Sequence, residues 1–325
     1  MIERDVIIVG GGPAGSTCAW KLKEAGHDPL ILDREEFPRL KLCAGWVTKK
    51  AMRQLQLKPA DYPHSFLTYP EIHAHFKGLH VKIPGKQHSI RRYEFDEFLL
   101  KRSGAEVQRH EVKSIVREDG RYIIDGRYRC TYLVGAGGTR CPVYRALFRK
   151  ANPRAKILQT ATREEEFPHE WENGQCHLWF FDKGLPGYAW YVPKANGYLN
   201  VGVGGMAAGL AGSKYNIHDH WTYFTEKLAR KGFVAHDYQP KGFSYFVRGG
   251  VETVRIGNAF ITGDSAGLAT KDLCEGIGPA IESGLKAAAA IAEGAPYSLE
   301  DVTSRSIKYG FVSKLIEYGM MRGLR

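Results

Sequence analysis

The sequence predicts an α/β fold in which a Rossmann-like dinucleotide-binding domain carries an inserted domain of mainly antiparallel strands. A glycine-rich turn joins a buried strand to a helix within residues 6–26, and a stretch of similar composition returns at 259–294. Between them, residues 151–250 alternate aromatic and small residues, which is typical of antiparallel sheets. We therefore expect a discontinuous nucleotide-binding domain with a second domain inserted into it.

Composition limits the possible functions. At 325 residues the chain is long enough for two domains, and its net charge is +11. The basic residues are scattered, which argues against nucleic acid as a partner. The six cysteines show neither a CxxC pair nor metal-site spacing, so we expect free thiols and no metal. No apolar run approaches the roughly 18 residues of a membrane span, and "DVIIVG" begins almost at once, which predicts a cytoplasmic protein.

The stretch "DVIIVGGGPAGSTCAWKLKEAG" predicts a strand, a turn and a helix, with Gly10, Gly12 and Gly15 at the G-x-G-x-x-G positions. The first glycine would make the tight turn, the second would let the backbone approach a pyrophosphate, and the third would let the helix pack on the strand. Pro13 and Ala14 lie in the same turn, at the positive end of the helix dipole. All five residues are candidates for dinucleotide binding.

The next strand, "PLILD", ends in Asp33 and is followed by Arg34. A carboxylate at this position accepts hydrogen bonds from the adenosine ribose in dinucleotide-binding folds. The loop "KLCAG" at residues 41–45 then brings a basic side chain close to the thiol of Cys43. Two interpretations stay open: a loop beside the ring of a bound cofactor, or a loop whose cysteine has no role.

Two further segments belong to the same domain. The stretch "IRRYEFDEFLLKRSG" predicts a helix from Tyr93 to Gly104. Arg92 precedes it and either reaches the cofactor or is a capping or surface arginine. The strand in "RYRCTYLVGAGG" runs into glycines at 135–138, and we expect it in the same sheet, near the cofactor.

An aromatic hairpin, "LPGYAWYVPKANGYLNVGVGG" at 185–205, dominates the inserted domain. Tyr188, Trp190 and Val192 share one face of its first strand, because side chains alternate along a strand. One face should pack on the helix expected at 218–232, and the other should face a cavity in which the following glycines leave room for a flat or long ligand. An aromatic sheet core without a cavity is the alternative.

The last nucleotide-binding segment contains a strand at 259–262 that ends at Gly263 and Asp264. Ligands of open α/β sheets bind at this end of the strands, so Asp264 would accept from ribityl hydroxyls, unless it only caps the turn that follows. The tight loop at 275–279 leads into an alanine-rich helix, whose N-terminus would face the electron-rich end of a flavin.

These pieces, in this order, resemble the flavin-binding fold of the para-hydroxybenzoate hydroxylase type. The resemblance rests on the glycine turn, on Arg92 shortly before Phe95-Asp96, on Gly263-Asp264, and on the loop 276–278. It covers nearly the whole chain and implies bound FAD. Gly137 stands where the hydroxylases usually have aspartate, so the electron donor is either NADPH or NADH, or a separate reductant protein.

Two motifs are similar to those of the geranylgeranyl reductases: "KLCAG" and "YAWYVPKANGYLNVGVG". This resemblance implies that reduced FAD delivers hydride to an isoprenoid carbon–carbon double bond, with Cys43 next to the flavin. Tyr188 and Trp190 would line the substrate cavity and, with Cys43, are the candidate catalytic residues. Tyr188 stands where the flavin halogenases have tryptophan, which argues against halogenation.

The C-terminal stretch would form a helix with Ile307, Phe311, Leu315 and Tyr318 on one face. We expect this face to pack on the FAD-binding domain. Alternatively, residues 305–325 make a peripheral contact with the inner face of the membrane.

Together these observations assign residues 1–65, 90–150 and 251–325 to the FAD-binding domain, and residues 66–89 and 151–250 to the substrate domain. They predict an FAD-dependent oxidoreductase that reduces carbon–carbon double bonds in an isoprenoid or other hydrophobic substrate. An FAD-dependent monooxygenase, and a flavoprotein that carries electrons or assists maturation of a partner, are the alternatives. The candidate cofactor-binding residues are Gly10, Gly12, Pro13, Ala14, Gly15, Asp33, Arg34, Lys41, Cys43, Ala44, Arg92, Gly137, Gly263, Asp264, Gly276, Ile277 and Gly278.

Overall fold

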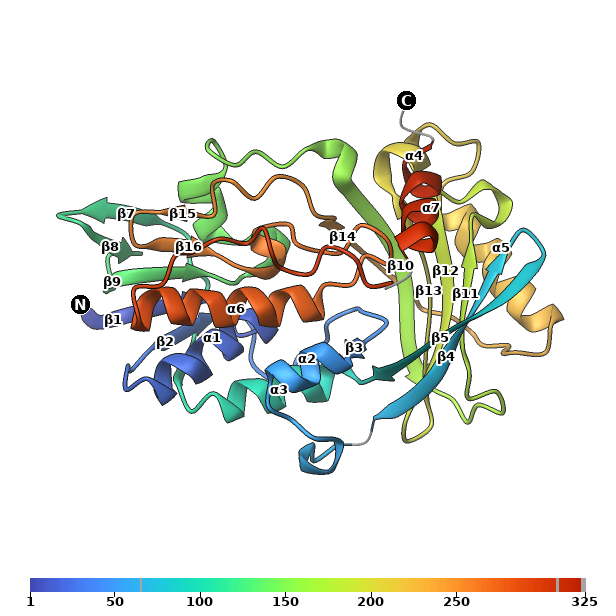
Figure 1. Ribbon diagram of the computed structural model, residues 1–325, viewed down its shortest axis with the longest axis horizontal. Coiled ribbons are helices and arrows are strands. Elements are labelled where there is room, and N and C mark those ends of the chain that lie inside the picture. The colour runs from blue at the N-terminus through green and yellow to red at the C-terminus, as the bar shows by residue number, and fades with distance from the viewer. Residues whose placement is uncertain (65, 308–309, 323–325) are drawn as a thin grey trace. The chain divides into compact units, whose positions relative to one another are not determined.

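The computed structural model describes residues 1–64, 66–307 and 310–322, and the chain divides into two compact units (Figure 1). Unit 1 comprises Met1–Arg39, Tyr93–Arg154 and Phe246–Ser304, and unit 2 comprises Leu40–Arg92, Ala155–Tyr245 and Arg305–Arg325. Both helices and strands occur in each unit, so the predicted α/β class is confirmed.

Unit 1 is built on a sheet whose central strands are parallel. The order is β15-β16-β9-β1-β2-β6, and the hairpin β7–β8 joins through β9. The strands β1, β2, β6, β9 and β16 run parallel, whereas β15, β7 and β8 pair in antiparallel fashion. The bounds are β1 Ile2–Val9, β2 Leu30–Asp33, β6 Glu106–Arg109, β7 Ile115–Glu118, β8 Arg121–Ile124, β9 Tyr128–Gly135, β15 Arg255–Ile256 and β16 Ala259–Ile261.

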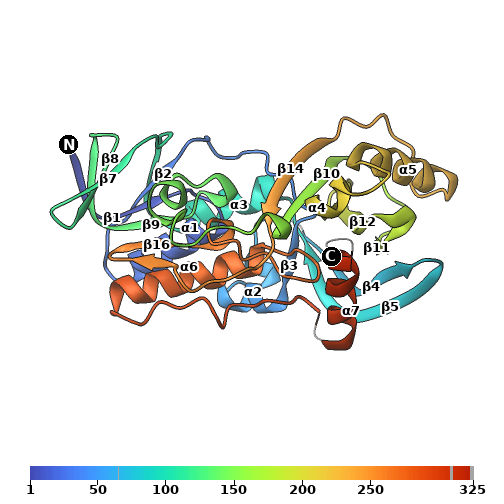
Figure 2. The same cartoon turned by 90° about the horizontal axis from the view of Figure 1, so that it is seen from above.

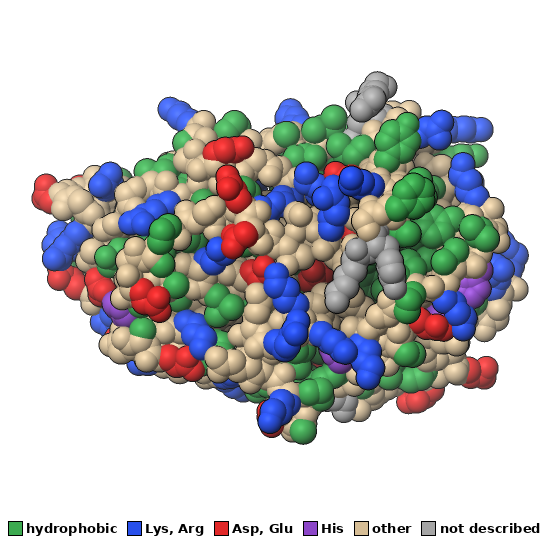
Figure 3. All heavy atoms as spheres, viewed as in Figure 1, with side chains coloured by type: hydrophobic (Ala, Val, Ile, Leu, Met, Phe, Trp, Pro, Cys, Tyr) green, Lys and Arg blue, Asp and Glu red, His purple; other side chains and the backbone are tan. Residues whose placement is uncertain are grey.

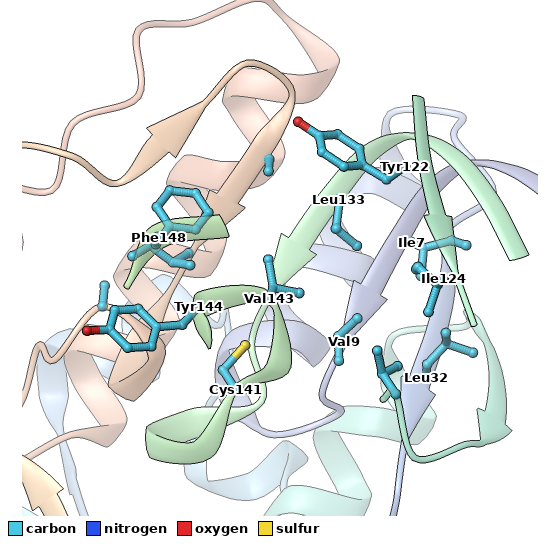
Figure 4. Close-up of a cluster of buried hydrophobic side chains, with 14 of the residues drawn as sticks. Ile7, Val9, Leu32, Tyr122, Ile124, Leu133, Cys141, Val143, Tyr144 and Phe148 are labelled. Atoms are coloured by element: carbon cyan, nitrogen blue, oxygen red, sulfur yellow. The ribbon is translucent and has the colours of Figure 1, made fainter. Parts of the chain in front are cut away.

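Alternate residues of β1 point to opposite faces of this sheet, so each face has its own apolar core. Val6 and Ile8 pack with α1 (Pro13–Glu24) and α6 (Ile277–Ala292). Ile7 and Val9 lie in the cluster on the other face, with side chains from β8 and residues 141–148 (Figure 4). The helix α3 (Arg92–Arg102) adds Leu100 to the first cluster. This layering fixes the carboxyl ends of β1, β9 and β16, where the predicted glycine turns lie.

Unit 2 is built on an eight-stranded sheet with the order β14-β10-β13-β12-β11-β4-β5-β3. From β10 to β3 neighbouring strands pair in antiparallel fashion, except that β11 runs parallel to β4. The bounds are β3 Trp46–Thr48, β4 Leu67–Phe76, β5 Leu79–Ser89, β10 Gln159–Pro168, β11 Cys176–Phe180, β12 Gly187–Lys194, β13 Tyr198–Met206 and β14 Lys241–Phe246. The predicted antiparallel character of this part of the chain is confirmed.

The predicted hairpin is β12–β13, and Asn196 and Gly197 turn it with positive φ angles of 60° and 66°. Ala189 and Tyr191 pack in the apolar cluster of α5 (Ile217–Arg230), which runs along one side of the sheet (Figure 2). Tyr188, Trp190 and Val192 therefore lie on the opposite face of the sheet, as predicted from the alternation. The short helices α2 (Lys49–Gln54) and α4 (Ala207–Ala211) complete the unit together with α7 (Gly310–Met321).

The two longest departures from the predicted boundaries are the segment after residue 39 and the C-terminal segment; residues 90–92, 151–154 and 246–250 also belong to the other unit. Residues 40–65 fall in unit 2, because β3 pairs with β5. The C-terminal segment also falls in unit 2, where α7 lies against β13. The prediction that Phe311, Leu315 and Tyr318 pack inward is wrong: these side chains are exposed, and Ser313, Ile316 and Met320 form the buried face of the helix.

Candidate functional site

The glycine turn of unit 1 has two positions with different surroundings. Gly15 lies so close to the Gly10 carbonyl that a Cβ atom would overlap it, and this approach brings α1 onto β1. A Cβ on Gly12 would meet only Arg39, with its Nη2 atom 3.4 Å away. No side chain caps the helix at Gly12, and no acidic residue occupies the first turn. The helix N-terminus therefore presents its amide groups and positive dipole to a ligand.

Asp33 and Arg39 flank this turn. The Asp33 carboxylate is buried and accepts hydrogen bonds from the amides of Gly11 (2.7 Å) and Glu35 (2.9 Å). It therefore braces the turn at the end of β2, the position expected for the ribose partner. The Arg39 guanidinium lies 3.2 Å from the buried Asp96 carboxylate. Asp96 thus holds a cation beside Gly12, where a pyrophosphate would need one.

The other predicted glycine loops of unit 1 meet at the ends of neighbouring strands. Asp264 follows β16, and its Oδ1 atom would lie 3.3 Å from a Cβ on Gly276. Glu275 accepts a hydrogen bond from the Gly278 amide (2.6 Å) at the start of α6, which includes Ile277. The structure thus brings Asp264 together with the 276–278 loop.

Arg154 ties two of these loops together. Its guanidinium donates to the carbonyls of Thr139 (2.6 Å) and Ser265 (2.7 Å) and lies over the Tyr144 ring. Gly137 comes just before the first of these loops, and the Ala136 amide donates to the Val9 carbonyl at the end of β1 (2.8 Å). Hydrogen bonds therefore join the strand ends of β1, β9 and β16 to one another.

In unit 2, Lys194 fixes the "KLCAG" loop. Its ammonium group is 1% exposed and donates to the carbonyls of Ala44 (2.7 Å) and Ile90 (2.7 Å). A Glu166 oxygen lies 3.6 Å away, and Glu166 also accepts from Arg91 (2.8 Å). Burial lowers the pKa of Lys194, and the opposing charge of Glu166 raises it. The loop and the end of the β12 hairpin strand are therefore held together by a buried, charge-balanced lysine.

A second polar group lies on the same face of the unit 2 sheet. The indole Nε1 of Trp190 donates to Asn200 Oδ1 (2.6 Å), and Asn200 Nδ2 donates to Glu164 Oε2 (3.3 Å). Gly202 pairs with Glu164 on one side and with Trp190 on the other, and a Cβ there would overlap the indole. Burial raises the pKa of Glu164 to about 7.

The remaining predicted residues fall as follows. Cys43 is half-buried, and its sulfur accepts from the Gly45 amide (3.3 Å). The Lys41 ammonium lies over the Phe243 ring, 3.3 Å from its centre. Arg92 is the buried first residue of α3, and Arg34 is exposed beside Glu35. Tyr188 is buried against Trp190. Close contacts therefore link Ala44 with Lys194 in unit 2 and Asp264 with the 276–278 loop in unit 1, whereas Arg34 lies apart, exposed beside Glu35.

Sequence reasoning missed Arg39, Arg154, Glu164 and Lys194. Lys194 lies within the quoted hairpin, and a charged residue in an otherwise apolar strand was the available signal. Glu164 belongs to a run of three glutamates, and a run of charged residues in a sequence gives no sign that one of them is buried. The positions of Arg39 and Arg154 in the sequence do not indicate which residues these two side chains contact. Within the described ranges, no cluster of His, Cys, Asp or Glu is suited to hold a metal ion.

The residues of unit 1 fit a dinucleotide such as FAD. The open backbone at Gly12, the uncapped helix and the Arg39 cation suit a pyrophosphate. The carboxylates of Asp33 and Asp264 suit ribose and ribityl hydroxyls. A model of the NAD(P)-binding Rossmann-like domain matches residues 8–74.

Relatives match most of the chain. An uncharacterised protein of Methanosarcina barkeri is 30% identical over 97% of this chain and 78% of its own length. A digeranylgeranylglycerophospholipid reductase of Methanosphaera stadtmanae is 26% identical over 88% of this chain and 77% of its length. A menaquinone reductase of Mycobacterium tuberculosis is 28% identical over 87% of this chain and 75% of its length.

Solved structures show the same fold. A geranylgeranyl bacteriochlorophyll reductase-like protein from Thermoplasma acidophilum superposes with a TM-score of 0.79 and 18% identity, covering 99% of this chain and 86% of the other. A flavin-dependent brominase superposes with a TM-score of 0.72 and 19% identity, covering 92% of this chain and 81% of the other. The chain belongs to one family with the Methanosarcina barkeri protein, and it resembles the geranylgeranyl reductase-like flavoproteins in sequence and fold.

Proposed function

We propose that this protein reduces carbon–carbon double bonds in the isoprenoid chain of a hydrophobic substrate. One observation carries the proposal: Lys194 ties the "KLCAG" loop to the end of the aromatic hairpin strand within unit 2. These are the two motifs that resemble the geranylgeranyl reductases, and the contact supports the proposal that they act as one site.

Each candidate residue has a defined task in this proposal. The glycine turn, Arg39 and Asp264 bind FAD, which supplies hydride when reduced. Tyr188 and Trp190 present large apolar surfaces that orient the alkene and exclude water. Cys43 positions the substrate or gives it a proton, and the anchored loop keeps its thiol in place.

The substrate class comes from the names of the relatives. A digeranylgeranylglycerophospholipid reductase and menaquinone reductases both occur among them. We infer that the substrate of this protein carries a polyprenyl tail. The aromatic side chains of β12 recognise this tail, and not the polar head group of the substrate.

A monooxygenase is the second candidate, because a flavin-dependent brominase shares the fold. Oxygen dependence separates the two: a monooxygenase consumes oxygen in step with product, whereas a reductase works without it. Tyr188 stands at the first tryptophan position of the halogenase motif, which favours reduction.

Membrane lipid is the proposed source of the substrate. Among the described residues, no helix is both long and apolar enough to cross a membrane. Hydrophobic side chains gather over α7 (Figure 3), where Phe311 is 80% and Tyr318 59% exposed. Lys314 is exposed on the same helix, and Arg322 is exposed directly after it. Apolar and basic side chains together suit an anionic lipid surface. Co-sedimentation with anionic vesicles should weaken in Phe311→Ser; unchanged binding would contradict this contact.

The test of the proposed function is anaerobic. The flavin is reduced with dithionite or with NADPH, and geranylgeraniol or menaquinone dispersed in detergent is then added. We expect the flavin bands to return while geranylgeraniol, or the polyprenyl chain of menaquinone after its ring has been reoxidised, gains two hydrogen atoms by mass spectrometry. Bleaching by dithionite alone would indicate a protein electron donor. Reduced flavin that is reoxidised only by oxygen would contradict the proposal. Cys43→Ala should lower turnover while flavin content stays unchanged.

A further inference from the structure

Glu164 is a buried acid whose role the candidate site leaves unexplained. Its side chain leaves β10 on the face that carries Trp190, and the residue is 3% exposed. Burial of a carboxylate costs folding free energy unless the group is protonated or paired with an opposite charge, so a buried carboxyl group needs an explanation in structure or function. Within the described part of the chain, its carboxyl group accepts a hydrogen bond from Asn200.

The surroundings of Glu164 contain the residues that are the strongest candidates for substrate and flavin contact. Asn200 bridges it to the Trp190 indole by hydrogen bonds of 3.3 and 2.6 Å. The charges of Lys41, from the "KLCAG" loop, and of Lys194, which anchors that loop, act on it electrostatically. Gly202 lies between Glu164 and Trp190 in the sheet, and no larger residue would let the indole lie there. The acid is thus placed where the two family motifs converge.

We propose that Glu164 is the proton donor of the reduction, held by Asn200 beside the Trp190 indole. An isolated alkene stabilises a carbanion poorly, so its reduction needs a proton delivered together with the hydride. One alkene carbon receives hydride from the reduced flavin, and the π electron pair forms a new C–H bond at the other carbon with the Glu164 proton. The O–H bond of Glu164 breaks, and its carboxylate later takes a proton from water. This inference rests on the proposed function.

The protonation state supports this role. Burial raises the pKa of Glu164 to about 7, and Glu166 also raises it, whereas Asn200, Lys41 and Lys194 lower it. At neutral pH a large share of the molecules therefore carries the proton, and a donor whose pKa lies near the working pH is the most effective general acid.

The test compares Glu164→Gln with Glu165→Gln. The first substitution keeps the shape of the side chain and the contact with Asn200 but removes the acidic proton. Glu165 is the next residue of β10, on the other face, and accepts from the Gln239 amide. We expect E164Q to lower geranylgeraniol reduction about 100-fold or more, with unchanged flavin content and dithionite bleaching. E165Q should keep wild-type turnover. E164Q turnover within threefold of wild type would overturn the inference.

A second readout does not depend on turnover. In the full-length protein with oxidised flavin, labelled with ¹³C at the glutamate carboxyl carbons, the signal that E164Q removes should titrate near pH 7. A titration near the ordinary glutamate value would overturn the inference even if E164Q folded poorly. If wild type reduces neither geranylgeraniol nor menaquinone, the proposed function fails instead, and the titration distinguishes the two failures.

Discussion

The glycine turn of unit 1 is a short continuous segment of small residues, whereas Glu164 and Lys194 of unit 2 are long side chains from separate strands. Gly12 and Gly15 act by having no side chain: one leaves room for a ligand, and the other lets a helix approach. Glu164 and Lys194 act by reaching across the sheet to buried partners. The glycine turn therefore depends on the absence of side-chain atoms, and the Glu164 and Lys194 group depends on buried polar contacts, so we expect substitutions to affect the two regions differently.

The largest effect is expected for Gly15→Ala. The new methyl group would overlap the Gly10 carbonyl, and backbone cannot yield as a flexible side chain can. We expect a loss of on the order of 5 kcal/mol, enough to unfold a domain of ordinary stability. Urea unfolding followed by circular dichroism measures it.

Gly12→Ala is the matched control for this change. Gly12 has φ −73°, which alanine adopts without strain, and only Arg39 lies near the new methyl group. We expect unfolding within about 0.5 kcal/mol of wild type but at least tenfold weaker FAD binding by fluorescence titration. Undiminished FAD affinity would show that the pyrophosphate does not pass over Gly12.

Lys194→Met should cause the next largest loss of stability, and it tests the buried contacts of unit 2. It removes the ammonium group that binds the Ala44 and Ile90 carbonyls and leaves Glu166 with Arg91 alone. Loss of one partner of a buried ion pair costs about 3–4 kcal/mol, and the loop at 41–45 should loosen. Chemical denaturation and the rate of Cys43 alkylation measure the two effects.

Lys101→Met serves as the control, because Lys101 makes an exposed pair with Glu97 on α3. Such a pair contributes about 0.5 kcal/mol or less. If K194M and K101M were equally stable, the buried lysine would not hold the loop.

Gly202→Ala should have an intermediate effect. The methyl group would meet the Trp190 indole and the Glu164 side chain, and overpacking of this kind costs about 1–3 kcal/mol. Replacing Trp190 by Leu in the same chain should recover part of the loss, because the smaller side chain leaves room for the methyl group. A double-mutant cycle of unfolding free energies measures the coupling, and additive effects would contradict the contact.

The same difference explains what the sequence could predict. The turn at Gly10–Gly15 is a local pattern, so its spacing predicted strand, turn and helix. Lys194 and Ala44 are 150 positions apart, and Glu164, Asn200 and Trp190 come from three strands. Their meeting depends on strand order and register, which spacing along the chain does not contain. The prediction for the C-terminal helix was wrong for another reason. Its apolar periodicity identified a hydrophobic face, but periodicity does not tell whether another part of the protein covers that face.

The smallest effect concerns four histidines on the other face of the unit 2 sheet: His73, His75, His80 and His177. His75 and His177 lie 3.1 Å apart through Nε2 and Nδ1, and His80 and His73 make a similar contact. Burial, followed by the neighbouring imidazoles, lowers the pKa of His75 to about 4 and that of His177 to about 3. Burial also lowers the pKa of His73, although the nearby Glu71 carboxylate acts to raise it. His75 and His177 are therefore neutral in the folded protein at pH values, between about 4 and 6.5, at which these residues are protonated in the unfolded chain.

A lowered histidine pKa means that the unfolded state binds more protons below about pH 6.5, so stability falls as the pH drops from there toward 4. Glu164 acts in the opposite direction between about pH 7 and 4.5, because its pKa is raised in the folded state. The difference between wild type and His177→Gln isolates the histidine contribution. Allowing for screening of the partly exposed His75, we expect the variant to recover about 1–2 kcal/mol of the acid-induced loss by urea unfolding at pH 7 and 4.5. Equal losses in both proteins would mean that the imidazoles titrate independently of folding, so that their burial does not contribute to the loss of stability at acid pH.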